Sequence, residues 1–140
     1  MHKFLPYAWF KGELVPFAEA NVSIATHSLH YGTAAFGGMR AIPDPSDSSS
    51  ILFFRVDKHV KRLCQSAKLL LSELSEESVR QALEIFIKAN KPDKPIYLRP
   101  FLYTSDLGIA PRLHDIETDF LIYGIELGDY LPPDGVNCRF

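Results

Sequence analysis

The sequence predicts an α+β domain in which a mostly antiparallel sheet is covered by two helices. Short runs rich in aromatic and β-branched residues lie near both ends of the chain, and such residues favour strands. Two segments with helical periodicity, residues 57–71 and 75–90, lie between these runs. Strands followed by helices and then by further strands are typical of the α+β class.

The composition is that of one globular domain. The chain has 140 residues, of which 46% are hydrophobic and 23% charged, which is enough for a core of its own. A formal net charge of -2 gives no basic surface, so we expect neither nucleic acid nor a membrane as a partner. No apolar run has the length of a signal peptide or a spanning helix, which favours a cytoplasmic protein. Cys64 and Cys138 lack metal-ligand spacing, and we expect reduced thiols.

The first predicted element is a β-hairpin formed by residues 7–10 and 13–17. The two strands flank Lys11-Gly12, where glycine can adopt the positive φ of a tight turn. Residues 33–40 can be extended, which would place Phe36 and Arg40 on one face. Residues 42–50 are polar and contain proline, which predicts a mobile loop. Residues 51–55 are expected to form a strand that pairs with its neighbour across this loop.

The two predicted helices carry apolar residues at helical spacing. Asp57 is placed to cap the first helix, whose apolar positions are Val60, Leu63, Cys64, Ala67, Leu70 and Leu71. Ser75 is placed to begin the second, and residues 90–92 are placed to stop it. The apolar positions of the second helix are Val79, Ala82, Leu83, Phe86 and Ile87. We expect both helices to cover the same face of the sheet.

Residues 96–104 and 120–125 are predicted to be strands joined by a connection at 106–118. In the first of them, alternation gives an aliphatic face and a second face that carries Tyr97, Arg99, Phe101 and Tyr103. The arginine can bind a carboxylate through its planar fork of donors, or it can simply stack on tyrosines at a solvated edge. Pro100 indicates an edge or bulge position.

Residues 27–40, with the sequence HSLHYGTAAFGGMR, have a composition that is unusual for a core. The glycines permit close backbone approach, while Tyr31, Phe36 and Arg40 supply a hydroxyl, an apolar wall and a fixed charge. These are components of a small-molecule pocket, and the alternative is a glycine-rich strand and turn whose aromatic residues belong to the core. His27 and His30 have H-x-x-H spacing without a third ligand, so we interpret both as hydrogen-bonded structural residues and predict no metal site.

This stretch resembles the signature S-H-x-L-H-Y-G-x-x-x-F-E-G-x-R of branched-chain amino acid aminotransferases, which are pyridoxal-phosphate enzymes of fold type IV. The resemblance extends to H-x-x-R-L at residues 59–63 and to Y-I-R-P, present here as Tyr97-Leu98-Arg99-Pro100. It covers essentially the whole chain. The sequence departs from the pattern at Gly37, where most of the family has glutamate.

The resemblance implies that residues 1–140 are the small N-terminal domain of an enzyme that transfers the amino group between leucine, isoleucine or valine and 2-oxoglutarate. It implies that Arg62 contacts the phosphate of the cofactor, although the residues alone indicate a solvated charge off the apolar stripe of its helix. It also implies that Tyr97 lines the substrate pocket and that Arg99 meets the distal carboxylate of glutamate.

By the same resemblance, Tyr31 reaches the neighbouring subunit's site, which implies a homodimer or a larger homo-oligomer. The full set of predicted substrate-binding residues is Tyr31, Phe36, Arg40, Tyr97 and Arg99. We also expect an exposed aromatic face, where a second domain and a partner subunit would sit, formed by Tyr31, Phe36, Tyr97, Phe101 and Tyr103.

The lysine that holds pyridoxal phosphate as a Schiff base lies in the second domain of this family, and no lysine of this chain stands in the corresponding motif. We therefore assign no catalytic residue here and expect a fragment that is inactive alone and does not bind the cofactor stably. Two alternatives remain. One is another fold type IV enzyme, such as a D-amino acid aminotransferase or an aminodeoxychorismate lyase. The other is a non-catalytic binding or assembly module, which the missing lysine and Gly37 would favour.

Overall fold

The computed structural model describes residues 3–127 and 135–138. Its elements are β1 (Lys3–Phe4), β2 (Tyr7–Phe10), β3 (Glu13–Pro16), the 3-10 helix η1 (Phe17–Glu19), α1 (His27–Tyr31), β4 (Ala34–Phe36), β5 (Met39–Asp44), β6 (Asp47–Phe53), α2 (Val56–Leu69), α3 (Glu76–Asn90), β7 (Ile96–Thr104) and β8 (Thr118–Glu126). The strands form one eight-stranded sheet in the order β3-β2-β8-β7-β5-β6, with β1 on β8 and β4 on β7. All of these pairings are antiparallel.

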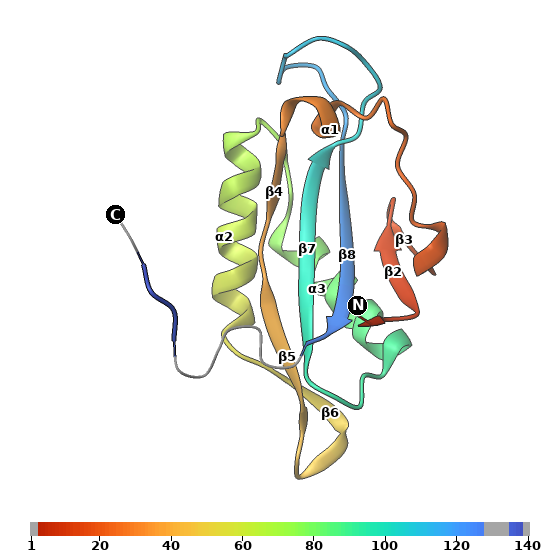
Figure 1. The fold of residues 1–140 in the computed structure, drawn as a ribbon, viewed down its shortest axis with the longest axis vertical. Helices are drawn as coiled ribbons and strands as arrows, with labels where there is room; N and C mark the ends of the chain where they lie inside the picture. Colours follow the sequence, from red (N-terminus) through yellow and green to blue (C-terminus); the bar gives the residue numbers. More distant parts are fainter. Residues whose placement is uncertain (1–2, 128–134, 139–140) are drawn as a thin grey trace.

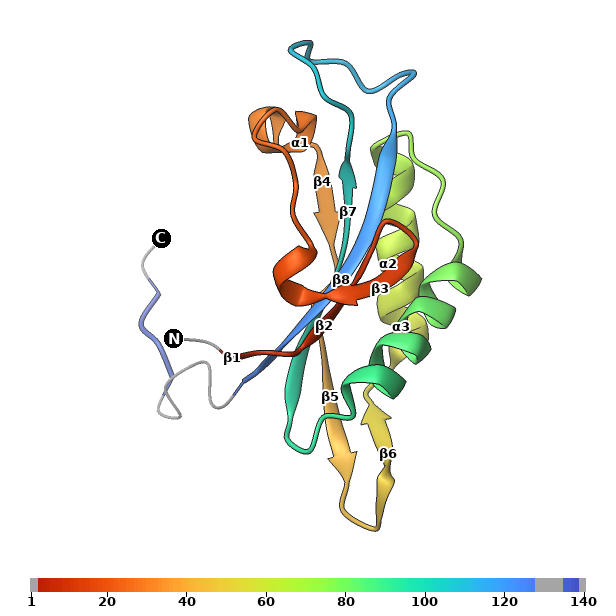
Figure 2. The same ribbon diagram turned by 90° about the vertical axis from the view of Figure 1, so that its right-hand side faces the viewer.

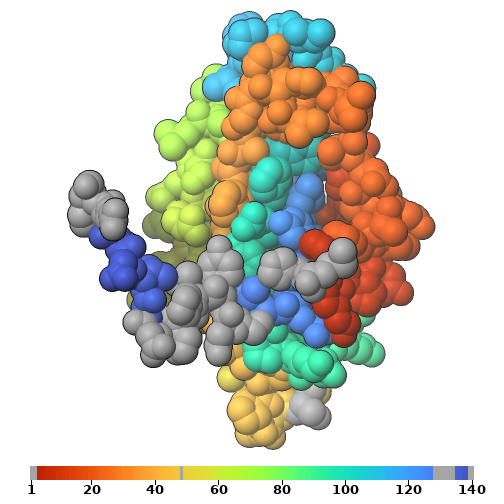
Figure 3. All heavy atoms as spheres, in the orientation of Figure 1, coloured from red at the N-terminus to blue at the C-terminus, as the bar shows by residue number. Residues whose placement is uncertain are grey.

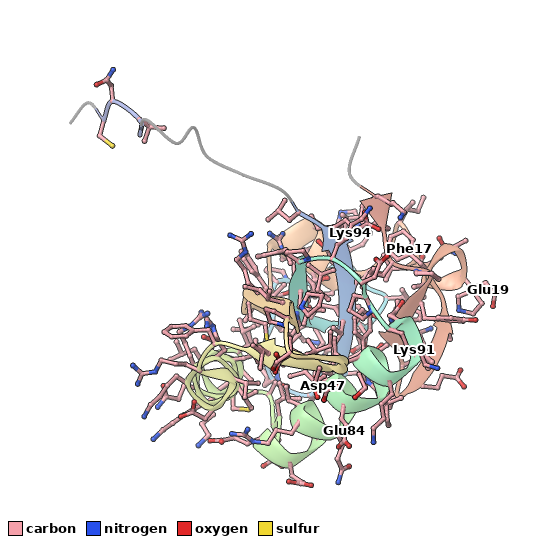
Figure 4. The ribbon with its side chains drawn as sticks, turned by 90° about the horizontal axis from the view of Figure 1, so that it is seen from below. Phe17, Glu19, Asp47, Glu84, Lys91 and Lys94 are labelled. Atoms are coloured by element: carbon pink, nitrogen blue, oxygen red, sulfur yellow. The ribbon has the colours of Figure 1, made fainter. Side chains whose placement is uncertain are left out.

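The sheet has one covered face and one open face. Helices α2 and α3 pack on one side of it, while α1 and η1 lie on the other (Figures 1 and 2). Viewed from the end of the β5–β6 hairpin, Glu84 extends from α3 away from the sheet (Figure 4). The arrangement confirms the predicted α+β class with an antiparallel sheet and two long helices.

The β2–β3 and β5–β6 hairpins both have tight turns, and the β5–β6 hairpin contradicts the sequence prediction. In the β2–β3 turn, Lys11 and Gly12 have φ values of 52° and 81°, as expected for this two-residue connection. The predicted mobile loop at residues 42–50 is wrong, because β5 and β6 pair through it and Ile42 lies opposite Leu52. The turn is ordered by its own side chains, since Asp44 accepts a hydrogen bond of 2.8 Å from the backbone N–H of Ser46.

Helix α2 begins and ends differently from the prediction. Its first helical residue is Val56, it follows Arg55 in a left-handed conformation, and Asp57 lies inside the first turn without capping it. The buried positions are Val60, Leu63, Cys64 and Ala67, as the spacing predicts. The helix stops at Leu69 because the chain turns to a φ of 56° at Leu71, whose side chain is 70% exposed rather than part of the core.

Helix α3 follows its sequence closely. The hydroxyl of Ser75 accepts a hydrogen bond of 3.0 Å from the N–H of Ser78, which satisfies one of the free donors at the helix start. The helix ends at Asn90, where Lys91 adopts a φ of 42° before Pro92. The buried positions Val79, Ala82, Leu83 and Phe86 pack on the sheet. This confirms the predicted cap, stripe and stop.

Strand β7 forms the centre of the core. Its bounds match the prediction, and its aliphatic face lies against the helices with Ile96, Leu98 and Leu102 buried. Pro100 lies in this central strand, not at the edge or bulge that the sequence predicts. Its carbonyl accepts a 3.0 Å hydrogen bond from Gly37, but proline has no N–H to return one. The missing bond falls where β4 has ended and β5 has not begun.

The short helix α1 is not foreseen by the sequence analysis. It ends at Gly32, which has a φ of 66° and donates a 3.0 Å hydrogen bond to the carbonyl of Ser28. A residue with a side chain would be strained in this left-handed conformation, so glycine is suited to ending the helix. Within the described part of the chain, no helix is both long enough and apolar enough to span a membrane.

Candidate functional site

The open face of the sheet brings together four of the predicted substrate-binding residues. Phe36 on β4 lies opposite Phe101 on β7, and Arg40 on β5 lies opposite Tyr97. Opposite residues of an antiparallel pair point to the same side, so Phe36, Arg40, Tyr97 and Arg99 share one face, as predicted. Side chains of β7 and β8 are visible on this face between β4 and the N-terminal segment (Figure 3).

Arg99 is the centre of this group. Its guanidinium carbon lies 4.4 Å from the centroid of the Phe36 ring and 5.4 Å from that of Tyr97. Its Nη2 donates a hydrogen bond of 3.2 Å to the hydroxyl of Tyr97. Burial acts to lower the pKa of Arg99, but the phenols of Tyr97 and Tyr123 outweigh it and the pKa is raised. The two rings therefore hold a permanently charged, half-buried guanidinium whose remaining donors have no carboxylate partner among the described residues.

Gly38 makes room for the ring of Tyr97. A Cβ atom at this position would lie 2.8 Å from the Cε2 atom of Tyr97, which is closer than real contacts allow. The ring of Tyr97 thus lies over the backbone between β4 and β5. Because the hydroxyl on this ring accepts the hydrogen bond of Arg99, the absence of a side chain at Gly38 helps to position the guanidinium.

An apolar hollow of about 330 Å³ lies beside Arg99 on the open face. Its lining is Ala8, Trp9, Phe17, Ala20, Val22, Arg99, Phe101, Leu121 and Tyr123. The sequence analysis missed the contribution of β8, although alternation in this strand was the signal that could have placed Leu121 and Tyr123 together. The hollow can accommodate an aliphatic group next to a fixed positive charge.

Arg62 approaches the sheet from the helix layer. It is exposed on α2, and its Nη2 atom lies 3.7 Å from the position that a Cβ atom of Gly37 would occupy. The backbone carbonyl of His59 is 3.9 Å from that position. Among the described residues no carboxylate forms an ion pair with Arg62, and the buried Nδ1 atom of His59 has no hydrogen-bond partner. The end of β4 therefore lies against an exposed arginine of α2 that has no carboxylate partner among the described residues.

The two histidines have structural roles, as predicted. His27 is buried, with Nδ1 2.9 Å from the hydroxyl of Thr33 and Nε2 2.7 Å from the carbonyl of Ala110. His30 Nε2 lies 2.8 Å from the carbonyl of Ile24. The ring of Tyr31 is tilted by 46° against that of His27, with ring centroids 4.6 Å apart. Tyr31 thus lies against the histidines of α1 rather than against the Arg99 group.

Tyr103 does not belong to the exposed aromatic face that the sequence predicts. It lies on the same side of β7 as Arg99, but only 3% of its surface is exposed and its hydroxyl donates a 3.0 Å hydrogen bond to Asp119. Burial, followed by the nearby carboxylate of Asp119, raises the pKa of Tyr103. Phe36, in contrast, is 50% exposed, and Tyr31, Tyr97 and Phe101 are half-buried.

Comparisons with known proteins agree with this architecture. No family model matches the chain. A probable branched-chain-amino-acid aminotransferase of Synechocystis sp. is 58% identical over 139 residues, which are 99% of this chain and 46% of that protein. The branched-chain aminotransferase of Thermoproteus uzoniensis, solved with norvaline, superposes with a TM-score of 0.82 at 28% identity, covering 94% of this chain and 43% of that one.

A second similar structure is the branched-chain amino acid aminotransferase of Thermobaculum terrenum, solved in its PLP-form. It has a TM-score of 0.75 at 25% identity and covers 87% of this chain and 40% of that one. The chain thus spans less than half the length of the relatives that it matches.

Proposed function

Because this chain corresponds in sequence and in fold to the N-terminal part of branched-chain aminotransferases, we propose that it is the small domain of such an enzyme. The proposed reaction is transfer of the amino group between leucine, isoleucine or valine and 2-oxoglutarate. One observation carries this proposal: on the open face of the sheet, the guanidinium of Arg99 lies against the aromatic rings of Phe36 and Tyr97.

Arg99 supports the recognition of two unlike substrates. A planar guanidinium binds a carboxylate through two parallel hydrogen bonds, which suits the distal carboxylate of glutamate and of 2-oxoglutarate. The ring of Phe36 and the apolar hollow beside Arg99 suit an aliphatic side chain, which gains free energy by leaving water. Different sides of one site can then bind the carboxylate of glutamate and the aliphatic side chain of leucine. Arg40, opposite Tyr97, is proposed to add positive charge at its margin.

The residues around Arg62 fit the phosphate of pyridoxal phosphate. The guanidinium of Arg62 has no carboxylate partner among the described residues, and its Nη2 atom lies 3.7 Å from the position of a Gly37 Cβ atom. The buried Nδ1 atom of His59, on the same helix, also has no hydrogen-bond partner. We propose that Arg62 holds the phosphate there by charge-assisted hydrogen bonds. When bound, the cofactor supplies a carbonyl group that reacts with amines and an aromatic ring that accepts electrons.

No residue of this chain is assigned as the catalytic amine. All eight lysines of the sequence are exposed: Lys3, Lys11, Lys58, Lys61, Lys68, Lys88, Lys91 and Lys94. An amine that must act as a nucleophile near neutral pH is usually activated by burial or by a neighbouring cation. The role of this chain is therefore proposed to be binding and orientation, with the amine supplied by another part of the enzyme.

The tip that carries α1 is proposed to contact a second subunit. The backbone N–H of His27 donates a 2.8 Å hydrogen bond to the carbonyl of Asp106, which ties the 106–118 connection to α1. Around Tyr31 this tip exposes four large apolar side chains, Ile24, Leu29, Leu107 and Ile109, the last of them to 96%. Exposed apolar groups of this kind favour association. This supports the proposed homo-oligomer.

A chimera tests the proposed function. In it, this chain replaces the 139 matched residues of the Synechocystis relative. We expect the chimera to transfer the amino group of leucine to 2-oxoglutarate when pyridoxal phosphate is present. A folded, cofactor-loaded chimera without this activity, beside an active parent protein, would contradict the proposal. Activity restricted to D-amino acids would instead favour another fold type IV enzyme.

A further inference from the structure

Neither the backbone conformation at position 37 nor the neighbouring atoms require a glycine there. It is buried, but its φ does not lie in the left-handed region, so residues with side chains can adopt the same conformation. The nearest atoms to an added Cβ are 3.7 to 3.9 Å away, which is ordinary van der Waals contact. The neighbouring Gly38 differs, because a side chain there meets the ring of Tyr97 at 2.8 Å. A Cβ atom at position 37 is therefore accommodated, and the atom nearest to it is Nη2 of Arg62.

We propose that Gly37 is a specificity-determining position, because its missing side chain leaves the charge of Arg62 available to a phosphate monoester. This inference rests on the proposed role of Arg62. Glutamate, the residue that most of the resembled family has at this point, would bring a carboxylate to the guanidinium. The carboxylate would then compete with the anion for the same donors.

The surroundings of Arg62 make this position decisive. On α2, the flanking cation Lys58 has Asp57 at 3.9 Å, whereas Arg62 has no carboxylate partner among the described residues. Lys61 is exposed beside it. A carboxylate introduced at Gly37 would thus be the first anionic group to meet this guanidinium. An ion pair with an exposed arginine is worth a factor of about 2 to 5 in an equilibrium constant. We expect a somewhat larger loss, about three- to tenfold, because position 37 is buried and the carboxylate and the phosphate compete for one guanidinium.

The matched variants are Gly37→Glu and Gly37→Gln, which add nearly the same volume and differ in charge. Nitrogen-15-labelled chain is titrated with pyridoxine 5'-phosphate at constant ionic strength, and the Nε–H signal of Arg62 is followed by NMR. Because the chain alone is expected to bind the phosphate only weakly, the titration is extended into the millimolar range. This probe has no aldehyde, so it does not react with the exposed lysines. Unchanged spectra outside the end of β4 and the start of α2 establish that each variant is folded.

We expect Gly37→Gln to bind within twofold of the parent chain and Gly37→Glu to bind three- to tenfold more weakly. Unphosphorylated pyridoxine should not distinguish the three proteins. In the absence of ligand, the carboxyl group introduced by Gly37→Glu should have a lower pKa than the same group combined with Arg62→Gln. Equal losses in Gly37→Glu and Gly37→Gln, or no difference between the two carboxyl pKa values, would overturn the inference.

Arg62→Gln in the parent chain separates this inference from the proposed function. If Arg62→Gln weakens phosphate binding and Gly37→Glu does not, the role of Gly37 is wrong and that of Arg62 stands. If Arg62→Gln leaves binding unchanged, the assignment of Arg62 to the cofactor phosphate is wrong, and the inference falls with it.

Discussion

The guanidinium of Arg99 lies 4.4 Å from the ring centroid of Phe36, across the boundary between β7 and β4. This contact joins the two sequence motifs that carry the aminotransferase resemblance, although 62 residues separate Phe36 from Arg99 in the chain. It places a fixed charge against an apolar wall, the arrangement on which the proposed binding of both leucine and glutamate depends. The first prediction follows from this pair.

Arg99→Ala, made in the chimera, should impair one half-reaction selectively. Loss of a charge-assisted, partly desolvated contact costs about 2 to 4 kcal/mol, or roughly 30- to 1000-fold in kcat/KM for glutamate and 2-oxoglutarate. Leucine should be affected far less. Single-turnover kinetics followed by cofactor absorbance measure both reactions. Arg80→Ala, which removes an arginine of α3 on the covered side, serves as the control. Equal losses for both substrates would mean that Arg99 is structural.

Gly38→Ala should displace the ring of Tyr97, because the added methyl group meets it at 2.8 Å. We expect a loss of about 1 to 3 kcal/mol in the free energy of unfolding, the usual cost of overpacking. Gly37→Ala is the matched control, since its Cβ has no neighbour closer than 3.7 Å. Urea denaturation measures all variants. The penalty of Gly38→Ala should largely disappear in a Tyr97→Ala background, and a penalty that persists there would exclude the ring as its cause.

The stability of the chain should depend on Tyr103 at high pH. Folding raises the pKa of this phenol, through burial and the carboxylate of Asp119, above the ordinary value of about 10. Above about pH 10 the unfolded chain loses the proton while the native state keeps it. The contribution is therefore complete below about pH 10 and decreases as the pH rises, by up to about 1.4 kcal/mol per pH unit.

Denaturation curves between pH 8 and 11 test this effect. Tyr103→Phe should have a shallower pH dependence than the parent chain above about pH 10. The same substitution at the exposed Tyr7 is the control and should leave the dependence unchanged. Parallel curves for Tyr103→Phe and the parent chain would show that Tyr103 titrates as it does in the unfolded state.

Borohydride reduction of the chain with pyridoxal phosphate should label no single lysine stoichiometrically, because all eight lysines are exposed. Mass spectrometry should find scattered, substoichiometric modification that resembles the reaction of free amines. Unfolded chain treated in the same way is the control and should give a similar pattern. Complete labelling of one lysine in the native chain alone would require a catalytic amine in this domain.

The sequence by itself determined the elements whose signals are local. The cap at Ser75, the buried stripe of α3 and the bounds of β7 agree with the prediction, because capping and periodicity depend on residues within a few positions of one another. Alternation also predicted that Phe36 and Arg40 share one face, and the strand pairing places Arg99 on the same face. The assignment of these residues to substrate binding stays a prediction, since geometry alone does not measure binding.

Tertiary structure decided what depends on distant partners. Helix α1 is held by His27, whose partners Thr104 and Ala110 come 77 and 83 residues later, and no local pattern announces such contacts. Alternation predicted the face of β7 on which Tyr103 lies, but not that this side chain is buried. Its hydroxyl bonds to Asp119, which lies opposite it on β8 and is distant in the sequence. Likewise, the residues next to Gly37 in the sequence do not indicate which side chain of another element lies against it. Only the packing of α2 beside β4 brings Arg62 there, because side-chain proximity across elements is fixed by the fold rather than by spacing along the chain.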